Sequence, residues 1–199
     1  MANDDFPRGL VPFGPGGPLR VQAYLASTAT DLYLGMPVAL DANGYAVPAD
    51  VTAASVSIGA IVGFQDGNGA GLAGGDPFLD VSDLGATLLD RPYVLVADHP
   101  DQMYLIQEDT GGSALTQAAV GATMFGVYGA TSGNDNTGWT RLELDRSGIA
   151  TTTAGFVTLL QLVDTLNSDG TKNAFGNYAK LKVRLSHHQL SGQQAVAQV

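Results

Sequence analysis

The segment Ala179-Lys-Leu-Lys-Val-Arg-Leu185 alternates apolar and basic residues at every position. Successive side chains of a β-strand point to opposite faces of the sheet, so this period of two predicts a strand with one buried and one solvated face. The residues expected to face the core are Leu181, Val183 and Leu185. The residues expected to face solvent are Lys180, Lys182 and Arg184.

Nine further segments resemble strands, because they are short, apolar or β-branched, and separated by Gly, Asn or Asp. They are 19–25, 36–40, 45–47, 58–64, 92–97, 102–107, 124–128, 139–144 and 156–163. Between 36–40 and 45–47, Asn43-Gly44 is a strong signal for a hairpin turn. One short helix fits at 114–120, and the turn-rich stretch 131–138 is expected to be a loop. The pattern predicts an all-β fold, a single β-barrel or sandwich-like domain of about nine to ten short strands.

The composition agrees with a β protein that has many turns. Only two of the 19 acidic residues are Glu and only three residues are Lys, although these two types are common on exposed helix faces. Gly and Pro, which favour turns, make up 35 of the 199 residues. There is no Cys, which excludes disulfides, zinc–thiolate sites and cysteine nucleophiles.

The charge argues against nucleic-acid and membrane partners. Nine basic and 19 acidic residues give a formal net charge of −10, and residues 21–90 contain eight Asp and neither Lys nor Arg. Such a surface repels phosphate groups, so we expect no binding of nucleic acid or anionic lipid. No apolar run reaches the roughly 18 residues of a transmembrane helix. The acidic start of the chain is not expected to be a secretory signal.

Residues 1–18 contain four Pro and four Gly, a density that neither a helix nor a central strand tolerates. Their apolar residues distinguish them from a simple flexible linker. We expect 1–18 to be an extended N-terminal arm that docks on a partner, the alternative being a disordered tail. The β domain would then span 19–190, and 191–199 would be a flexible tail. The expected contact residues of the arm are Phe6, Arg8, Leu10, Val11 and Phe13.

Catalytic and metal sites are not expected. No nucleophile motif accompanies the three histidines. His99 stands in a turn, and His187 and His188 are neighbours expected on opposite faces of a strand, so they cannot act together. The loop that begins at Asp66 resembles a calcium loop, but Ala70 stands where an oxygen ligand is needed, so a turn is favoured.

A second candidate for acid–base chemistry is an acidic cluster at one hairpin. Glu108 and Asp109 could meet Asp98 and Asp101 there, and paired carboxylates can act as general acid and base. We favour two solvated turns. No enzyme activity, cofactor or metal is therefore predicted.

Several motifs in order resemble a family of tailed-bacteriophage head proteins described as capsid decoration or cement proteins. They are Ala2-Asn-Asp-Asp-Phe-Pro-Arg-Gly-Leu10, Val96-Ala-Asp-His-Pro-Asp101, Ile106-Gln-Glu-Asp109, Leu142-Glu-Leu-Asp145 and the segment from Gly176 to Gln189. The resemblance covers most of the chain, and the stretch 65–90 departs from it.

The resemblance implies a structural virion protein on the outer surface of the capsid, where it binds the assembled icosahedral head and bridges major capsid protein subunits. It also implies self-association, as a homotrimer rather than a homodimer. The alternative is a phage tail or receptor-binding β module. Because the strands are expected to begin only near Leu19, deletion of residues 2–18 is expected to leave the β domain folded and to weaken attachment to the shell.

Overall fold

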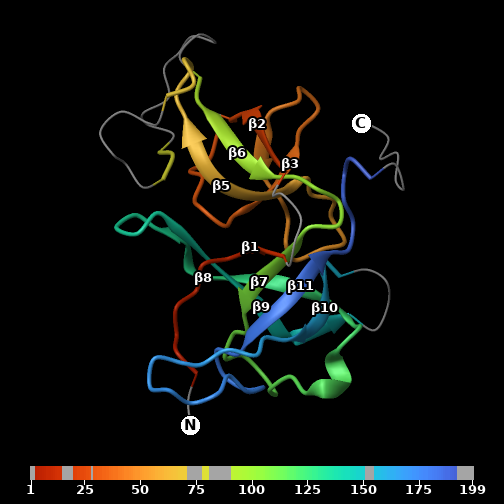
Figure 1. Ribbon diagram of the computed structural model, residues 1–199. Helices are drawn as coiled ribbons and strands as arrows, with labels where there is room; N and C mark the ends of the chain where they lie inside the picture. The colour runs from red at the N-terminus through yellow and green to blue at the C-terminus, as the bar shows by residue number, and fades with distance from the viewer. Residues whose placement is uncertain are drawn as a thin grey trace.

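The computed structural model describes residues 3–14, 20–27, 29–70, 78–80, 91–150 and 155–191, with the backbone alone at 148–150. Figure 1 shows two stacked halves, each built on one antiparallel sheet, with β1 lying between them. The expected tail at 191–199 lies outside the described residues except for Ser191, as do residues 15–19 and most of the stretch 71–90.

The lower half is a six-stranded sheet in the order β1-β7-β11-β10-β8-β9. In that order the strands span Val11–Phe13, Met103–Gln107, Lys180–Leu185, Val157–Leu162, Thr123–Asn134 and Trp139–Ala150. Beyond the end of β7, Glu108 forms a bridge to Leu144 of β9. The sheet therefore curls until β7 and β9 meet, which leaves little unpaired edge at that end.

The upper half is a five-stranded sheet in the order β2-β6-β5-β3-β4. In that order the strands span Val21–Leu25, Tyr93–Ala97, Gly59–Gln65, Pro37–Leu40 and Ala46–Pro48. Just after β2, Ala26 forms a bridge to Ala46, so this sheet also curls toward closure.

Each half encloses its own group of buried apolar side chains. Tyr104, Phe156 and Leu181 belong to the lower core, and Met36 and Val94 belong to the upper core. The side chain of Tyr128 packs against both cores, so the apolar interior continues from one half into the other.

The all-β prediction is confirmed, and each of the ten predicted segments overlaps a strand of the described structure. In β11 the alternation is as expected, since Leu181, Val183 and Leu185 are buried, and the basic residues between them are not. The expected helix is a single 3₁₀ turn at Gln117–Ala119.

Two expectations were wrong. Strands begin at Val11 and not near Leu19, because β1 pairs with β7. The stretch 131–138 is not all loop, because β8 continues to Asn134 and the turn is confined to 135–138. The added length lets the hairpin tip reach the upper half, where the Tyr33 hydroxyl donates a hydrogen bond of 2.9 Å to Asp135.

The first residues of the chain cross the upper half at a close backbone contact. Gly35 has φ +76°, and a Cβ atom there would collide with the Arg8 carbonyl oxygen. Two residues after Arg8, the Leu10 amide donates a hydrogen bond of 2.9 Å to the Gly35 carbonyl. Glycine is needed at position 35 for its conformation and for this approach.

We predict that Gly35→Ala destabilises the protein more than Gly44→Ala. Gly44 has a similar φ of +81° in the β3–β4 turn, but a Cβ atom there meets no atom within 4 Å. Gly44→Ala should cost about 1 kcal/mol for the left-handed conformation, and Gly35→Ala roughly 1–3 kcal/mol more for the collision. Urea unfolding of both variants measures the difference, and equal costs would contradict the close contact.

Candidate attachment surface

Residues 3–14 form a strap that runs along the lower half and ends in β1 (Figure 1). At its start, the Asn3 side chain donates hydrogen bonds of 2.9 Å to the carbonyls of Ala174 and Asn177. The Asp4 carboxylate accepts hydrogen bonds of 2.6 and 2.7 Å from the amide and hydroxyl of Ser168. These bonds lower the pKa of Asp4. The strap is thus fixed to the loop between β10 and β11.

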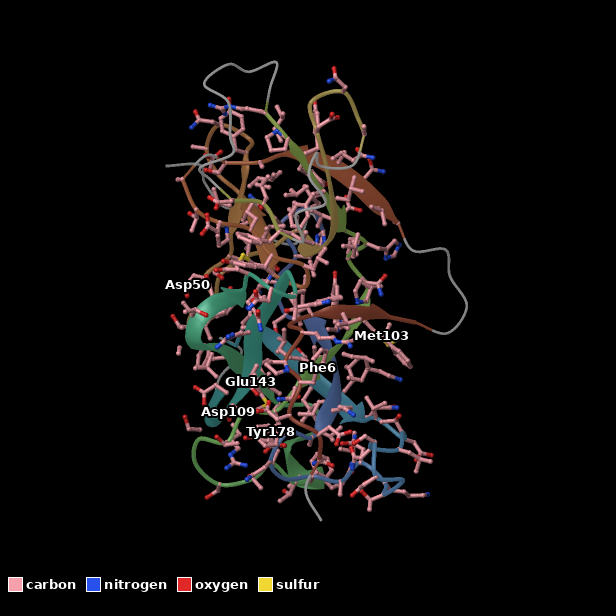
Figure 2. All side chains as sticks on the ribbon, turned by 90° about the vertical axis from the view of Figure 1, so that its left-hand side faces the viewer. Phe6, Asp50, Met103, Asp109, Glu143 and Tyr178 are labelled. Atoms are coloured by element: carbon pink, nitrogen blue, oxygen red, sulfur yellow. The ribbon has the colours of Figure 1, made fainter. Side chains whose placement is uncertain are left out.

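Gln107, at the end of β7, holds the middle of the strap. Its side-chain carbonyl accepts a hydrogen bond of 2.7 Å from the Phe6 amide, and its NH₂ group donates to the carboxylates of Asp5 and Glu143. Burial raises the pKa of Glu143, and the charges of Asp5 and Asp109 add to this, whereas the Gln107 bond opposes it. Figure 2 shows Phe6 and Glu143 near the middle of the molecule, with Asp109 and Tyr178 below them.

Leu10 does not belong to a partner-binding surface. Its side chain is 0% exposed and lies in the lower core. A side chain enclosed by its own domain cannot anchor a partner, so the expectation for Leu10 was wrong. The error has the same cause as the missed β1, since the strap is part of the folded domain.

The other four predicted contact residues remain at the surface. Phe6 is 50% exposed, and the Arg8 guanidinium lies 4.3 Å from the centre of its ring and 5.5 Å from the ring of Trp139. Both are cation–π distances, which hold the Arg8 side chain between two aromatic rings. No pattern in the sequence predicts that Trp139 is a neighbour of the strap.

Val11 and Phe13 lie half-buried in β1, paired with Leu105 and Met103. The Lys182 ammonium of β11 lies 4.8 Å from the centre of the Phe13 ring. Pro12, between them, has no N–H group to offer to a further strand. β1 is the terminal strand of its sheet, and Pro12 makes its outer edge a poorer template for a further strand.

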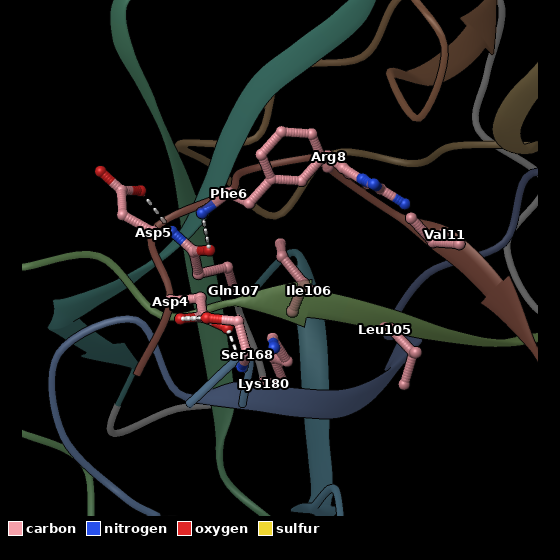
Figure 3. Close-up of a pocket in the computed structure, with 11 residues that line it drawn as sticks. Asp4, Asp5, Phe6, Arg8, Val11, Leu105, Ile106, Gln107, Ser168 and Lys180 are labelled. Atoms are coloured by element: carbon pink, nitrogen blue, oxygen red, sulfur yellow. Dashed lines mark hydrogen bonds between the residues drawn. The ribbon is translucent and has the colours of Figure 1, made fainter. Parts of the chain in front are cut away.

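A groove of about 660 Å³ lies between the strap, β7 and β11 (Figure 3). Phe6, Val11 and Leu105 supply its apolar lining, Arg8 and Lys180 supply positive charge, and Asp4 and Asp5 supply negative charge. Its shape and mixed lining suit binding of a polypeptide segment.

The acidic cluster expected at one hairpin is not formed. Asp98 and Glu108 are both 0% exposed and lie at opposite ends of β7, so the interpretation as solvated turns was also wrong for them. Asp98 pairs with Arg20 at 3.0 Å and accepts a hydrogen bond of 2.6 Å from the Tyr24 hydroxyl. Each buried carboxylate has a cationic partner, which indicates a structural role.

The second buried carboxylate, Glu108, lies against Arg146. The Arg146 NH1 atom is 3.6 Å from Glu108 Oε1, and its Nε atom is 3.9 Å from Asp109 Oδ1. Burial raises the pKa of Glu108, while the Leu115 amide and Arg146 act in the opposite direction. Arg146 had not been singled out from the sequence.

The loop at Asp66 is a turn, as expected. Asp66 Oδ1 accepts hydrogen bonds of 2.9 and 2.8 Å from the amides of Asn68 and Ala70. Within the residues that the structure describes, no group of three His, Asp or Glu side chains could hold a metal ion.

No protein-family model, no curated protein and no solved structure matches this chain. Among the described residues, no helix has the length and apolar character needed to span a bilayer. The candidate binding site is the surface formed by the strap and β11, which includes the groove between them.

His188 provides a prediction about pH. Its ring is buried, and its Nδ1 atom accepts a hydrogen bond of 3.1 Å from the Leu190 amide. Burial lowers the pKa of His188 below 6.5, although the carbonyls of Ile58 and Asp98 act against this. The unfolded chain therefore takes up a proton near pH 6.5 that the folded protein does not, so stability falls as the pH drops from about 6.5 toward the folded pKa.

We expect His188→Asn to reduce this loss, because asparagine retains an acceptor but does not titrate. The matched control is His99→Asn, since the His99 Nδ1 atom accepts the same type of bond from Asp101 in an exposed turn. Thermal melts between about pH 7 and pH 5 provide the measurement. An unchanged pH dependence in His188→Asn would contradict the assignment.

Proposed function

We propose that this protein is a structural component of a tailed-bacteriophage head, a capsid decoration protein that binds the outer surface of the assembled icosahedral shell. The ordered motifs supply the link to phage heads. The observation that carries a binding role is the strap: its backbone is fixed to the domain, while Phe6, Arg8, Val11 and Phe13 remain at the surface. A surface ordered before binding loses little conformational entropy when a partner docks.

In this proposal the partners are the major capsid protein and further copies of the chain. The protein would act as a homotrimer, rather than a homodimer, and the homotrimer would bridge neighbouring shell subunits. A protein that binds only the assembled lattice stabilises it by mass action, and repetition on the lattice turns modest contacts into avidity. No catalysis and no cofactor enter this role.

The second candidate is a phage tail or receptor-binding module, which a β-rich oligomer would also suit. The experiment that separates the two is quantitative mass spectrometry of purified virions, combined with sedimentation of the purified protein with particles that lack it. A decoration protein should occur in hundreds of copies and return to the shell. A handful of copies, or no binding to the shell, would overturn the proposal.

A further inference from the structure

The outer face of β1, β7 and β11 is ordered in rows. In an antiparallel sheet, directly paired residues point to the same face. One row runs from Val11 through Leu105 to Lys182. The next runs from Phe13 through Met103 to Arg184. Each row therefore passes from two apolar side chains to one basic side chain, and all are half-buried or exposed.

The basic ends of the rows form a column along β11. Lys180, Lys182 and Arg184 share one face at every second position, about 6.6–6.8 Å apart. The chain has nine basic residues in total, so a third of them lie in this column. The Asp4 carboxylate lies close enough to Lys180 for that positive charge to contribute to lowering the pKa of Asp4. Arg184 lies 3.9 Å from Asp101, with both side chains well exposed. An exposed pair of that kind neutralises little of the charge.

The groove beside the strap extends this face. The groove lining includes Val11 and Leu105 from the first row and Lys180 from the basic column. Figure 3 shows Phe6 and Arg8 on the far side of the groove. We call the outer face of β1, β7 and β11 together with this groove the docking face.

We propose that the docking face binds an extended acidic segment of a shell subunit, in which apolar and carboxylate side chains alternate. An extended chain laid along the strands directs successive side chains to opposite sides. One set would then lie over the apolar side chains of β1 and β7, and the other over the basic column at matching spacing. This inference rests on the proposed function and adds the location and the chemistry of the contact.

The alternation distinguishes this partner from other anions. A nucleic acid would need a broad positive surface, whereas this chain has a net charge of −10 and one basic column beside apolar side chains. The alternating segment provides carboxylates for the basic column and apolar side chains for β1 and β7.

The first test uses a labelled synthetic peptide, Glu-Val-Asp-Leu-Glu-Val-Asp-Leu, and fluorescence anisotropy at low salt. The peptide should bind the full-length protein, more tightly than a peptide of the same composition with all acidic residues placed before all apolar ones. Lys182→Glu should weaken binding by at least about tenfold, because like charges across an interface are strongly unfavourable. The matched control is Lys172→Glu, an exposed lysine in the β10–β11 loop, which should bind like the wild type.

Equal peptide binding by Lys182→Glu and wild type would overturn the docking face. Tighter binding of a single-stranded oligonucleotide than of the peptide, with the same dependence on Lys182, would replace the acidic segment by nucleic acid. Light scattering covers a third outcome: self-association that Lys182→Glu abolishes would identify a second copy as the occupant and also overturn the proposal.

The second test is sedimentation with shells that lack the protein. If the wild type and Lys182→Glu bind equally, this inference fails and the proposed function stands. If the wild type does not bind, the proposed function fails. The shell subunit can then no longer be the protein that carries the acidic segment. Melting temperatures of both variants confirm that the folds are intact.

Discussion

Leu10→Ala should lower the free energy of unfolding by about 2–5 kcal/mol, the cost of removing a buried leucine side chain and leaving a cavity. Leu10 is completely buried in the lower core. Of its neighbours, Gly9 is also buried, whereas residues 6–8 and 11–13 lie on or near the surface. Urea unfolding at neutral pH measures the loss.

The matched control is Phe6→Ala, four residues earlier on the same strap. Phe6 is half-exposed, so its replacement should change stability by no more than about 0.5 kcal/mol. The proposed function predicts the reverse order for shell binding, in which Phe6→Ala is the weaker binder. A Leu10→Ala protein as stable as Phe6→Ala would contradict the assignment of the strap to the folded domain.

The same placement changes what is expected of a deletion. Removal of residues 2–18 would take away Leu10 and β1 and expose the outer edge of β7. We now expect this deletion to prevent stable folding, and point substitutions at the surface are the better way to test attachment.

Arg146→Ala should destabilise the protein by about 3–5 kcal/mol, because it leaves the buried Glu108 carboxylate without its cation. The arginine is itself almost buried, and it donates hydrogen bonds of 2.9 and 2.8 Å to the Gly111 carbonyl and the Asn177 side chain. The loss should be smaller at about pH 5 than at pH 7, since protonation of Glu108 removes the uncompensated charge.

Arg184→Ala is the control for this second prediction. Its pair with Asp101 is exposed and 3.9 Å long, so its removal should cost less than about 1 kcal/mol. Chemical unfolding of both variants at the two pH values gives the comparison. Equal costs for the two arginines, or a loss in Arg146→Ala that does not depend on pH, would contradict the role of the buried pair.

The strands were predictable because their signal is local. In β11 every second residue is apolar, and that period is sufficient to predict both the strand and its buried face. Leu10 has no such signal, since it lies in a Pro- and Gly-rich stretch without a period of two, and the core that it joins is formed by residues at least 41 positions away, beginning with Val51. A single apolar residue is compatible with a core or with a partner surface.

The polar interactions of the site could not be predicted from the sequence for a related reason. Asp98 and Glu108 look like ordinary turn residues in sequence, and their burial depends on Arg20 and Arg146, which lie 78 and 38 positions away. Gln107 gives no sequence signal at all, because it acts through bonds to Asp5, Phe6 and Glu143. Side-chain hydrogen bonds between distant positions leave no periodic pattern.

The bonds of Asn3 also constrain when the molecule can be completed during synthesis. Asn3 bonds to the carbonyls of residues 174 and 177, which are 171 and 174 positions further along the chain. At about 5–20 residues per second, the ribosome needs roughly 10–35 s to add that length. Throughout this interval Asn3 has no partner for its side chain, and β7, the strand with which the strap pairs, is added only about halfway through. The Asn3 end of the strap therefore docks late, and a nascent chain stalled before residue 174 should leave Asn3 accessible to protease.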